Sequence, residues 1–166
     1  AVDKTVPEYK NPFHPSTYAH FVARKDYRKT YDVYKDDTLL NRQPKKSRKI
    51  FVCLDEQRGQ YLVDGLVAMD FPLSSGVKAY PTKTGDYAVI SKKEDHTSNL
   101  YGKMYDAEGK CINYNAESTD PIPEGGRFDG SPMPYWQRLT NAGLGLHVGK
   151  VRRHPVSHGC VRLPRN

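Results

Sequence analysis

Residues 61–71 have the sequence YLVDGLVAMDF, in which two apolar runs are joined by the dipeptide Asp64-Gly65. An Asp-Gly pair between two such runs is a strong signal for a two-residue β-hairpin, because both central positions of a type I′ turn need a positive φ. The apolar run at residues 50–54 comes shortly before this hairpin. Further short strands are expected at residues 85–90, 102–105, 111–114, 144–148 and 159–163. The sequence therefore predicts a mainly β domain.

Composition and length agree with a β domain that carries an appended segment. The chain has 166 residues, among them 13 glycines, 12 prolines and 12 tyrosines, and this usage favours a turn-rich β protein. We expect residues 1–49 to form a partly helical N-terminal extension, with a helix inside residues 16–34 that Ser16 caps. Residues 50–166 form the predicted main domain.

Two segments of the main domain have an ambiguous pattern. Residues 132–140 mix apolar and polar side chains and are expected to form a short helix. Residues 91–130 are polar and rich in turn residues, and a long stretch of this kind often forms a lid or a wall of a binding site. No apolar stretch approaches the length of a membrane span, and no signal peptide is recognised.

A thiol lies among histidines, a glycine and an arginine near the end of the chain, where residues 157–164 have the sequence SHGCVRLP. A free cysteine is mostly protonated at neutral pH, so a catalytic one needs an imidazole or a positive charge beside it. His147, His158 and Arg162 are the candidates for that partner of Cys160. The segment predicts acyl transfer through a thioester, and the alternative is a buried structural cysteine.

These motifs resemble the L,D-transpeptidase (YkuD-like) family of bacterial cell-wall enzymes. The resemblance rests on HVG at residues 147–149 followed by SHGCVRLP, on SSG at 74–76 with YPTKTGDY at 80–87, and on MPYW at 133–136 with GLGLH at 143–147. It implies a β-sandwich with a small helical element and a lid-like loop over the cleft, with residues 50–166 as the catalytic domain.

The resemblance also implies the catalytic roles. Cys160 is the expected nucleophile and His147 the expected general base. The second ring nitrogen of His147 needs an acceptor, which we expect to be a backbone carbonyl such as that of Val148, because no acidic residue lies in the motif. Gly159 permits a tight turn in which backbone N–H groups converge on a developing oxyanion.

His158 and Ser157 complete the candidate catalytic set, and each has a structural alternative. His158 is adjacent to the nucleophile and is less suited to be the base, so it either takes part in catalysis or holds the loop. The hydroxyl of Ser157 suits a loop anchor better than a second nucleophile.

Four further residues are candidates for substrate binding. Arg162 alternates with the nucleophile along a predicted strand, so both can face the cleft and the guanidinium can meet a substrate carboxylate; a structural salt bridge is the alternative. Tyr135 and Trp136 either wall the groove or pack in the core. Tyr105, or Tyr101 near it, is expected to line the cleft from the lid.

The other cysteines and histidines receive no catalytic role. Cys53 is expected to pack as a small apolar side chain, and a bridge between Cys53 and Cys111 stays open. His96 is expected to be a solvated loop histidine. No metal-ligand spacing is present, and neither a metal nor an organic cofactor is expected.

The net charge of +7 and the pI near 9.3 predict anionic partners. No arginine-rich helix or aromatic RNA-binding pattern is present, so nucleic acid is not expected. The resemblance implies peptidoglycan stem peptides and an amine acceptor as partners, with export to the periplasm or cell envelope. Two alternatives to transfer are an L,D-carboxypeptidase or peptide hydrolase, in which water replaces the amine, and a non-catalytic wall-binding module.

Overall fold

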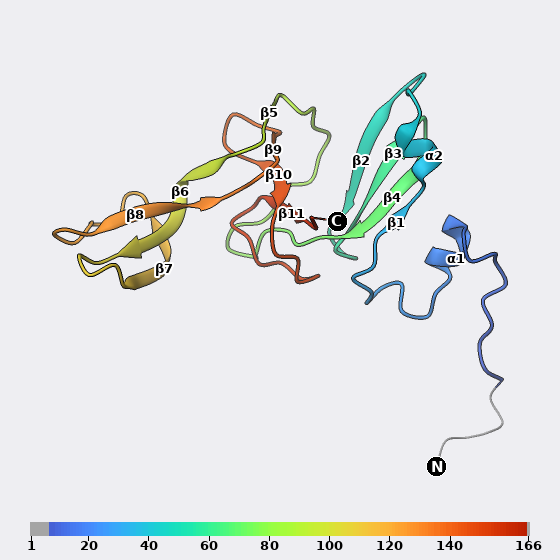
Figure 1. The fold of residues 1–166 in the computed structure, drawn as a ribbon, viewed down its shortest axis with the longest axis horizontal. Coiled ribbons are helices and arrows are strands. Elements are labelled where there is room, and N and C mark those ends of the chain that lie inside the picture. Colours follow the sequence, from blue (N-terminus) through green and yellow to red (C-terminus); the bar gives the residue numbers. More distant parts are fainter. Residues whose placement is uncertain (1–6, 166) are drawn as a thin grey trace, which may run out of the picture. The chain divides into compact units, whose positions relative to one another are not determined.

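The computed structural model describes residues 7–165, which form two compact units that divide between Leu73 and Ser74. Most regular structure in both units is strand, and the two helices of the described part are short (Figure 1). The prediction of a mainly β fold is confirmed. Among the described residues, no helix is long and apolar enough to cross a membrane.

The first unit is built on one four-stranded sheet with the strand order β1-β4-β3-β2. Its elements are α1 (Tyr18–Val22), β1 (Tyr34–Lys35), α2 (Asp37–Asn41), β2 (Arg48–Cys53), β3 (Arg58–Val63) and β4 (Leu66–Pro72). The hairpin of β3 and β4 closes at the pair Val63 and Leu66, and φ is 51° at Asp64 and 82° at Gly65. The predicted hairpin and its two positive φ angles are confirmed.

The N-terminal helix is much shorter than the sequence suggests. α1 has five residues, and its N-cap is Thr17, whose hydroxyl accepts a hydrogen bond from the His20 N–H. Ser16 is therefore not the cap, and the chain after Ala23 continues in turns. Two carbonyls of this later segment accept hydrogen bonds from a buried side chain: the Arg58 guanidinium donates to the Thr30 and Asp32 carbonyls at 3.1 and 3.2 Å. A helix would direct those carbonyls to its own N–H groups instead.

A buried ion pair joins the N-terminal segment to β3 and β4. Arg58 is 1% exposed and Asp70 is fully buried, and Arg58 Nε lies 2.6 Å from Asp70 Oδ1. The other carboxylate oxygen accepts hydrogen bonds from the hydroxyls of Tyr18 and Tyr27, at 2.7 and 2.8 Å. The guanidinium also lies over the ring of Phe21, 5.3 Å from its centre. Every polar atom of the carboxylate is thus satisfied, as burial of a charge requires.

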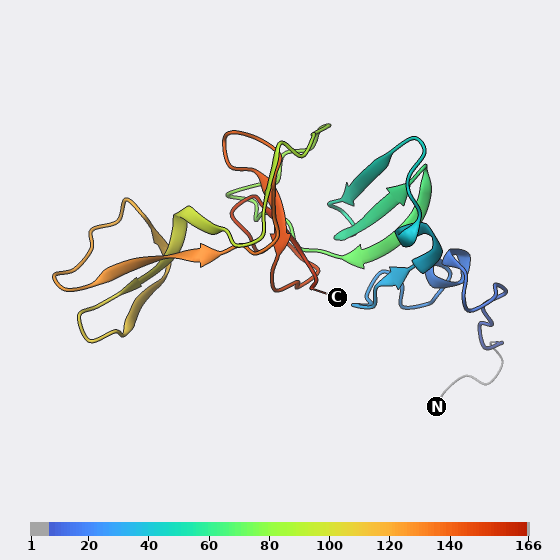
Figure 2. The same cartoon turned by 45° about the horizontal axis from the view of Figure 1, so that its top comes forward.

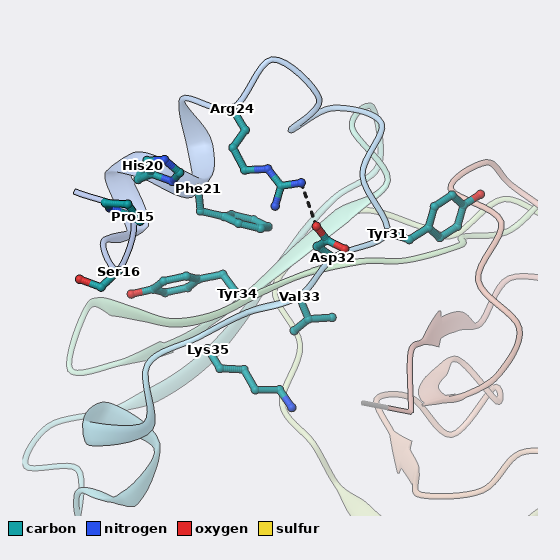
Figure 3. A pocket seen from close by; sticks show the side chains of 10 residues that line it. All are labelled: Pro15, Ser16, His20, Phe21, Arg24, Tyr31, Asp32, Val33, Tyr34 and Lys35. Carbon is teal, nitrogen blue, oxygen red and sulfur yellow. Dashed lines mark ion pairs between the residues drawn. The ribbon is translucent and has the colours of Figure 1, made fainter. Parts of the chain in front are cut away.

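A surface hollow of about 970 Å³ lies between α1 and residues 31–35. Figure 3 shows Arg24 reaching across it to Asp32, at 2.8 Å, with the ring of Phe21 below. The charged groups of the hollow are therefore partly paired with each other.

The second unit contains two sheets. The four-stranded sheet has the order β11-β10-β9-β5, and the three-stranded sheet has the order β7-β6-β8. Their strands are β5 (Ser91–Lys93), β6 (Thr97–Tyr105), β7 (Cys111–Glu117), β8 (Arg127–Pro132), β9 (Trp136–Arg138), β10 (Gly145–Val148) and β11 (Val161–Leu163). Figure 2 shows the long twisted arrows of β6 and β8 side by side, with β7 on the other edge of β6.

Three expectations for this unit are wrong. Residues 132–140 contain strand β9 and not a helix, because Pro132 and Pro134 disfavour helical backbone before them and Tyr135 has a φ of 55°. Residues 91–130 are largely the strands β5 to β8 and not mostly loop, although the strands predicted at residues 102–105 and 111–114 are present within β6 and β7. Residues 85–90 form no strand. Within this range, only the Ile90 N–H donates a backbone hydrogen bond to β9, to the Arg138 carbonyl.

All three cysteines, Cys53, Cys111 and Cys160, are free thiols.

Candidate active site

The segment with the candidate nucleophile enters the sheet beside the strand that carries His147. β11 pairs in parallel with β10, and the register places Leu146 opposite Val161 and His147 opposite Arg162. Leu146 and Val161 are 4% and 2% exposed, so this pair anchors both strands in the core. Side chains alternate along a strand, so the residues flanking this pair share the other face of the sheet. Cys160, just before β11, therefore comes close to the strand of the histidine.

A tight turn before β11 is held by side-chain hydroxyls. Gly159 has a φ of 117°, which favours glycine. Ser157 Oγ donates to the Cys160 carbonyl at 2.5 Å and accepts from the Gly159 N–H at 3.1 Å. Thr82 Oγ1 donates to the Gly159 carbonyl at 2.5 Å and accepts from the Gly76 N–H at 2.8 Å. Ser157 is thus placed as a loop anchor.

The segment of Ser74 to Gly76 borders this turn directly. Ser74 pairs with Arg162 through two backbone hydrogen bonds, of 3.1 and 2.8 Å, and Gly76 pairs with Ser157. A Cβ on Gly76 would meet the Tyr80 carbonyl oxygen at 2.1 Å and Gly159 Cα at 2.8 Å. The motif of residues 74–76 therefore shapes the backbone under the candidate nucleophile.

His147 is buried, with 7% of its surface exposed, and its Nδ1 lies 2.9 Å from the Val148 carbonyl. A carbonyl only accepts, so Nδ1 carries the proton and Nε2 keeps its lone pair. This is the hydrogen bond that the sequence predicted. Burial lowers the pKa of His147, the Val148 hydrogen bond opposes that effect, and the positive charges of Arg162 and His96 add to it. The imidazole is therefore neutral at pH 7 and able to accept a proton.

The Cys160 thiol is half-buried and donates a hydrogen bond to the Gly143 carbonyl, with Sγ 3.4 Å from the oxygen. Burial raises the pKa of the thiol, while the Gly145 N–H and the positive charges of Arg138 and Arg162 oppose that rise. The thiol is therefore protonated at neutral pH, and a base must remove its proton when it reacts.

The side chains of Arg162 and His147 both approach Gly149. A Cβ on Gly149 would meet Arg162 Cδ at 3.2 Å and His147 Cε1 at 3.4 Å. Burial lowers the pKa of Arg162, and the nearby sulfur opposes this. Both residues line the cleft that also holds the thiol.

Trp136 forms an aromatic wall with two histidines. Its ring stacks on His96 with centres 4.9 Å apart, and His147 lies 6.4 Å from it on a tilted plane. Trp136 is 3% exposed and covers Gly145, where a Cβ would lie 2.3 Å from the ring. His96 is therefore part of this wall and not the solvated loop residue that the sequence suggested, because its ring is covered by a tryptophan far along the chain.

A second aromatic group surrounds His158. The ring of Tyr101 stacks on it with centres 4.3 Å apart and an 18° angle, and Tyr80 lies 4.8 Å away. His158 thus joins β6 to the turn of the nucleophile. This placement agrees with the structural alternative for His158.

One cleft of about 1260 Å³ contains most of the predicted site residues. Its lining includes these predicted residues: Cys160, His147, Gly159, His158, Ser157, Arg162, Trp136 and Tyr101. Tyr105 and Tyr135 do not line it. Tyr105 pairs with Arg127 of β8 and lies under its guanidinium, whose carbon is 4.3 Å from the centre of the ring. Tyr135 is 52% exposed.

The cleft also contains residues that sequence reasoning did not find, chiefly His96 and Arg138. Both depend on the pairing of β5 and β10 with β9, which the sequence predicted as a helix. Among residues 7–165, no group of three or more His, Cys, Asp or Glu side chains is placed to hold a metal ion.

A cysteine and a histidine that line one cleft from neighbouring segments are the arrangement of thiol-dependent acyl-transfer enzymes. The family model of the L,D-transpeptidase catalytic domain (YkuD) matches residues 47–166. The chain therefore belongs to the L,D-transpeptidase (YkuD) family. No curated protein matches it.

The chain is similar to solved structures of L,D-transpeptidases. An L,D-transpeptidase from Stackebrandtia nassauensis is 22% identical with a TM-score of 0.50, and the match covers 89% of this chain and 54% of that one. An L,D-transpeptidase from Mycobacterium smegmatis is 21% identical with a TM-score of 0.48, over 68% and 46% of the two chains. The E. faecium catalytic domain is 28% identical with a TM-score of 0.48, over 72% and 82%. The chain thus spans about half the length of the first two proteins.

Proposed function

We propose that this chain is a peptidoglycan L,D-transpeptidase with Cys160 as the nucleophile and His147 as the general base. The observation that carries the proposal is the hydrogen bond from His147 Nδ1 to the Val148 carbonyl, which leaves Nε2 as a proton acceptor in the cleft that holds the thiol. Family membership supplies the substrate class, peptide stems of the bacterial cell wall.

The first half-reaction forms a thioester. His147 Nε2 takes the thiol proton of Cys160 as the sulfur attacks the carbonyl carbon between an L-centre and a D-residue of a tetrapeptide stem. The tetrahedral intermediate then collapses, the C–N bond breaks, and the imidazolium gives its proton to the departing D-amino acid. Because burial keeps the thiol protonated, proton removal and attack are coupled.

The oxyanion of the intermediate needs N–H donors in the turn before β11. The Gly159 N–H is already donated to Ser157 Oγ, so in this proposal the N–H of Cys160 is the first of the donors. Gly159 contributes through its positive φ, which gives the turn its shape.

The second half-reaction releases the enzyme. An acceptor amine attacks the thioester carbonyl, His147 accepts its proton, and the Cys160 thiolate leaves and regains a proton from the imidazolium. The acceptor is an amine of a neighbouring stem, of an envelope lipoprotein or of a free D-amino acid. We therefore propose the periplasm or cell envelope as its location, because peptidoglycan lies there.

The first test is acylation by a carbapenem, followed by intact mass. We expect one covalent adduct on the folded, reduced protein and none on a Cys160→Ala variant. Failure to acylate would contradict the role of Cys160 and favour a wall-binding module. Incubation with tetrapeptide stems then separates the reactions: cross-linked dimers indicate transfer, whereas trimmed tripeptides without dimers indicate a hydrolase.

A further inference from the structure

Every charged residue that lines the active-site cleft is positive. The lining includes six lysines and arginines and no aspartate or glutamate: Lys83, Lys103, Arg138, Lys150, Arg162 and Arg165. The chain has 19 acidic residues, so this is not a consequence of acid scarcity. In the described part of the chain, the ion pairs involve Arg24, Arg42, Arg58 and Arg127, and none of the six cleft cations.

Two of these cations flank the strand of the candidate base. Arg138 on β9 is opposite Gly145 of β10, and Arg162 on β11 is opposite His147 of the same strand. Both are partly buried, and Arg138 lies with its guanidinium carbon 5.6 Å from the centre of the Trp136 ring. The other four cations, Lys83, Lys103, Lys150 and Arg165, are exposed to solvent. The positive charge therefore surrounds the reacting centre and continues along the cleft.

Unpaired like charges in a concave, partly dry site repel one another and attract anions, because the cleft walls focus their field. A guanidinium also binds a carboxylate through two parallel hydrogen bonds, which an amide of the same size accepts far less well. A ligand that brings carboxylates relieves the repulsion, whereas its amide form leaves the cations unpaired.

We propose that this cleft selects peptide stems by their free carboxylates, with Arg138 and Arg162 as the specificity-determining pair, and that it discriminates against stems whose carboxylates are amidated. The inference rests on the proposed function for the identity of the ligand as a peptide stem. Its basis is the charge of the cleft, so its test does not depend on turnover.

The test is a binding comparison on the Cys160→Ala protein, which cannot be acylated. Two synthetic tetrapeptides of the same sequence are used, one with free side-chain carboxylates and one with those groups amidated. Trp136 is the one tryptophan of the chain and lines the cleft, so its fluorescence reports occupancy. We expect the free-acid peptide to bind roughly twofold to fivefold more tightly for each carboxylate, given the usual strength of partly exposed ion pairs. The difference should shrink as salt screens the charges.

Variants identify the residues. Arg138→Gln in the same background should narrow the difference between the two peptides, and Lys103→Gln should narrow it less, because Lys103 is exposed. Lys110→Gln is the matched control: Lys110 is exposed after the turn at Gly109 and does not line the cleft, so the difference should be unchanged.

Equal affinity for the two peptides at low salt would overturn the inference, as would a difference that Arg138→Gln leaves intact. Carbapenem acylation of the wild-type protein is measured in parallel. If the protein binds the free-acid peptide selectively but is not acylated, the selection of carboxylates stands and the proposed transpeptidase function is wrong. If the protein is acylated but binds both peptides equally, the transpeptidase function stands and the selection of carboxylates is wrong.

Discussion

Replacing Gly76 by alanine should slow acylation of Cys160 strongly while the protein stays folded. A Cβ at this position would lie 2.1 Å from the Tyr80 carbonyl oxygen, 2.8 Å from Gly159 Cα and 2.9 Å from Gly159 N. Real Cβ contacts are almost never shorter than 3.0 Å, so Gly76 must separate from the Tyr80 carbonyl by about 0.9 Å and from Gly159 by about 0.1–0.2 Å. Gly76 is paired with Ser157, three residues before the nucleophile, so a shift of Gly76 away from Tyr80 would displace the turn that carries Cys160.

A misplacement of about 1 Å at a reacting group costs on the order of a hundredfold in rate. The assay is the second-order rate constant for carbapenem acylation, followed by intact mass against time, with thermal unfolding as the check of folding. Gly109→Ala is the control: it has a φ of +80° and open space around it, so it adds backbone strain of about 1–2 kcal/mol without touching the cleft. Its acylation rate should match the wild type.

A second variant, Gly149→Ala, keeps the test informative if Gly76→Ala folds poorly. A Cβ on Gly149 meets the flexible side chain of Arg162 at 3.2 Å, which can move aside. Gly149→Ala should therefore fold and lose less acylation rate than Gly76→Ala. The reasoning is refuted if folded Gly76→Ala is acylated within about threefold of the wild-type rate, because a backbone displacement near 1 Å predicts a much larger loss of rate.

Three other predictions concern stability and pH. Asp70→Asn should lower the free energy of unfolding by about 3–5 kcal/mol in urea titrations, because Arg58 would remain charged and buried without its anion; a loss under about 1 kcal/mol would contradict the pair's role. Burial and the Asp70 carboxylate raise the pKa of Tyr27 to about 12 from 10.0, so its contribution to stability is full below pH 10 and is lost as pH rises from 10 toward 12. Constant stability across that interval in denaturant titrations would be inconsistent with the buried hydroxyl. Burial lowers the pKa of His147 below its ordinary 6.5 and raises that of Cys160 above 9.0, and the proposed reaction starts from a neutral imidazole and a protonated thiol, so the acylation rate should be nearly flat from about pH 7 to about pH 8.5; a rate that rises roughly tenfold from pH 7 to pH 8 would show that a thiolate reacts without the base.

Local chemistry made part of the fold predictable. The hairpin at Asp64-Gly65 was correct because turn geometry depends on the two residues themselves. The acceptor for His147 was correct because the neighbouring carbonyl of Val148 is always within reach and no acid competes in the motif.

The errors came from segments whose structure depends on distant partners. β5, which the sequence did not predict, has three residues that are all exposed, so the apolar and polar alternation that marks a strand is absent there. β9 has three residues and is defined by its pairing with β5 and β10 rather than by its own pattern. His96 and Arg138 belong to the cleft through those pairings, and no local signal distinguishes them from surface residues.

Distance along β6 explains the difference between the two tyrosines proposed for the lid. Tyr101 and Tyr105 are four residues apart, and a strand advances about 3.3 Å per residue, so their Cα atoms lie roughly 13 Å apart along β6. Tyr101 stacks on His158, whereas Tyr105 lies against Arg127. Which of the two meets the turn of the nucleophile depends on how distant segments pack, which the sequence does not show.

The match to the family begins at residue 47, yet the buried charge pair inside the first sheet is completed by residues that come earlier. The hydroxyls of Tyr18 and Tyr27 and the carbonyl of Thr30 supply bonds that no residue after position 46 replaces in the described structure. In a lineage that keeps Arg58 and Asp70, the upstream segment cannot be shortened or exchanged without exposing an ion pair in the core. Its length and its tyrosines should therefore be inherited together with that pair.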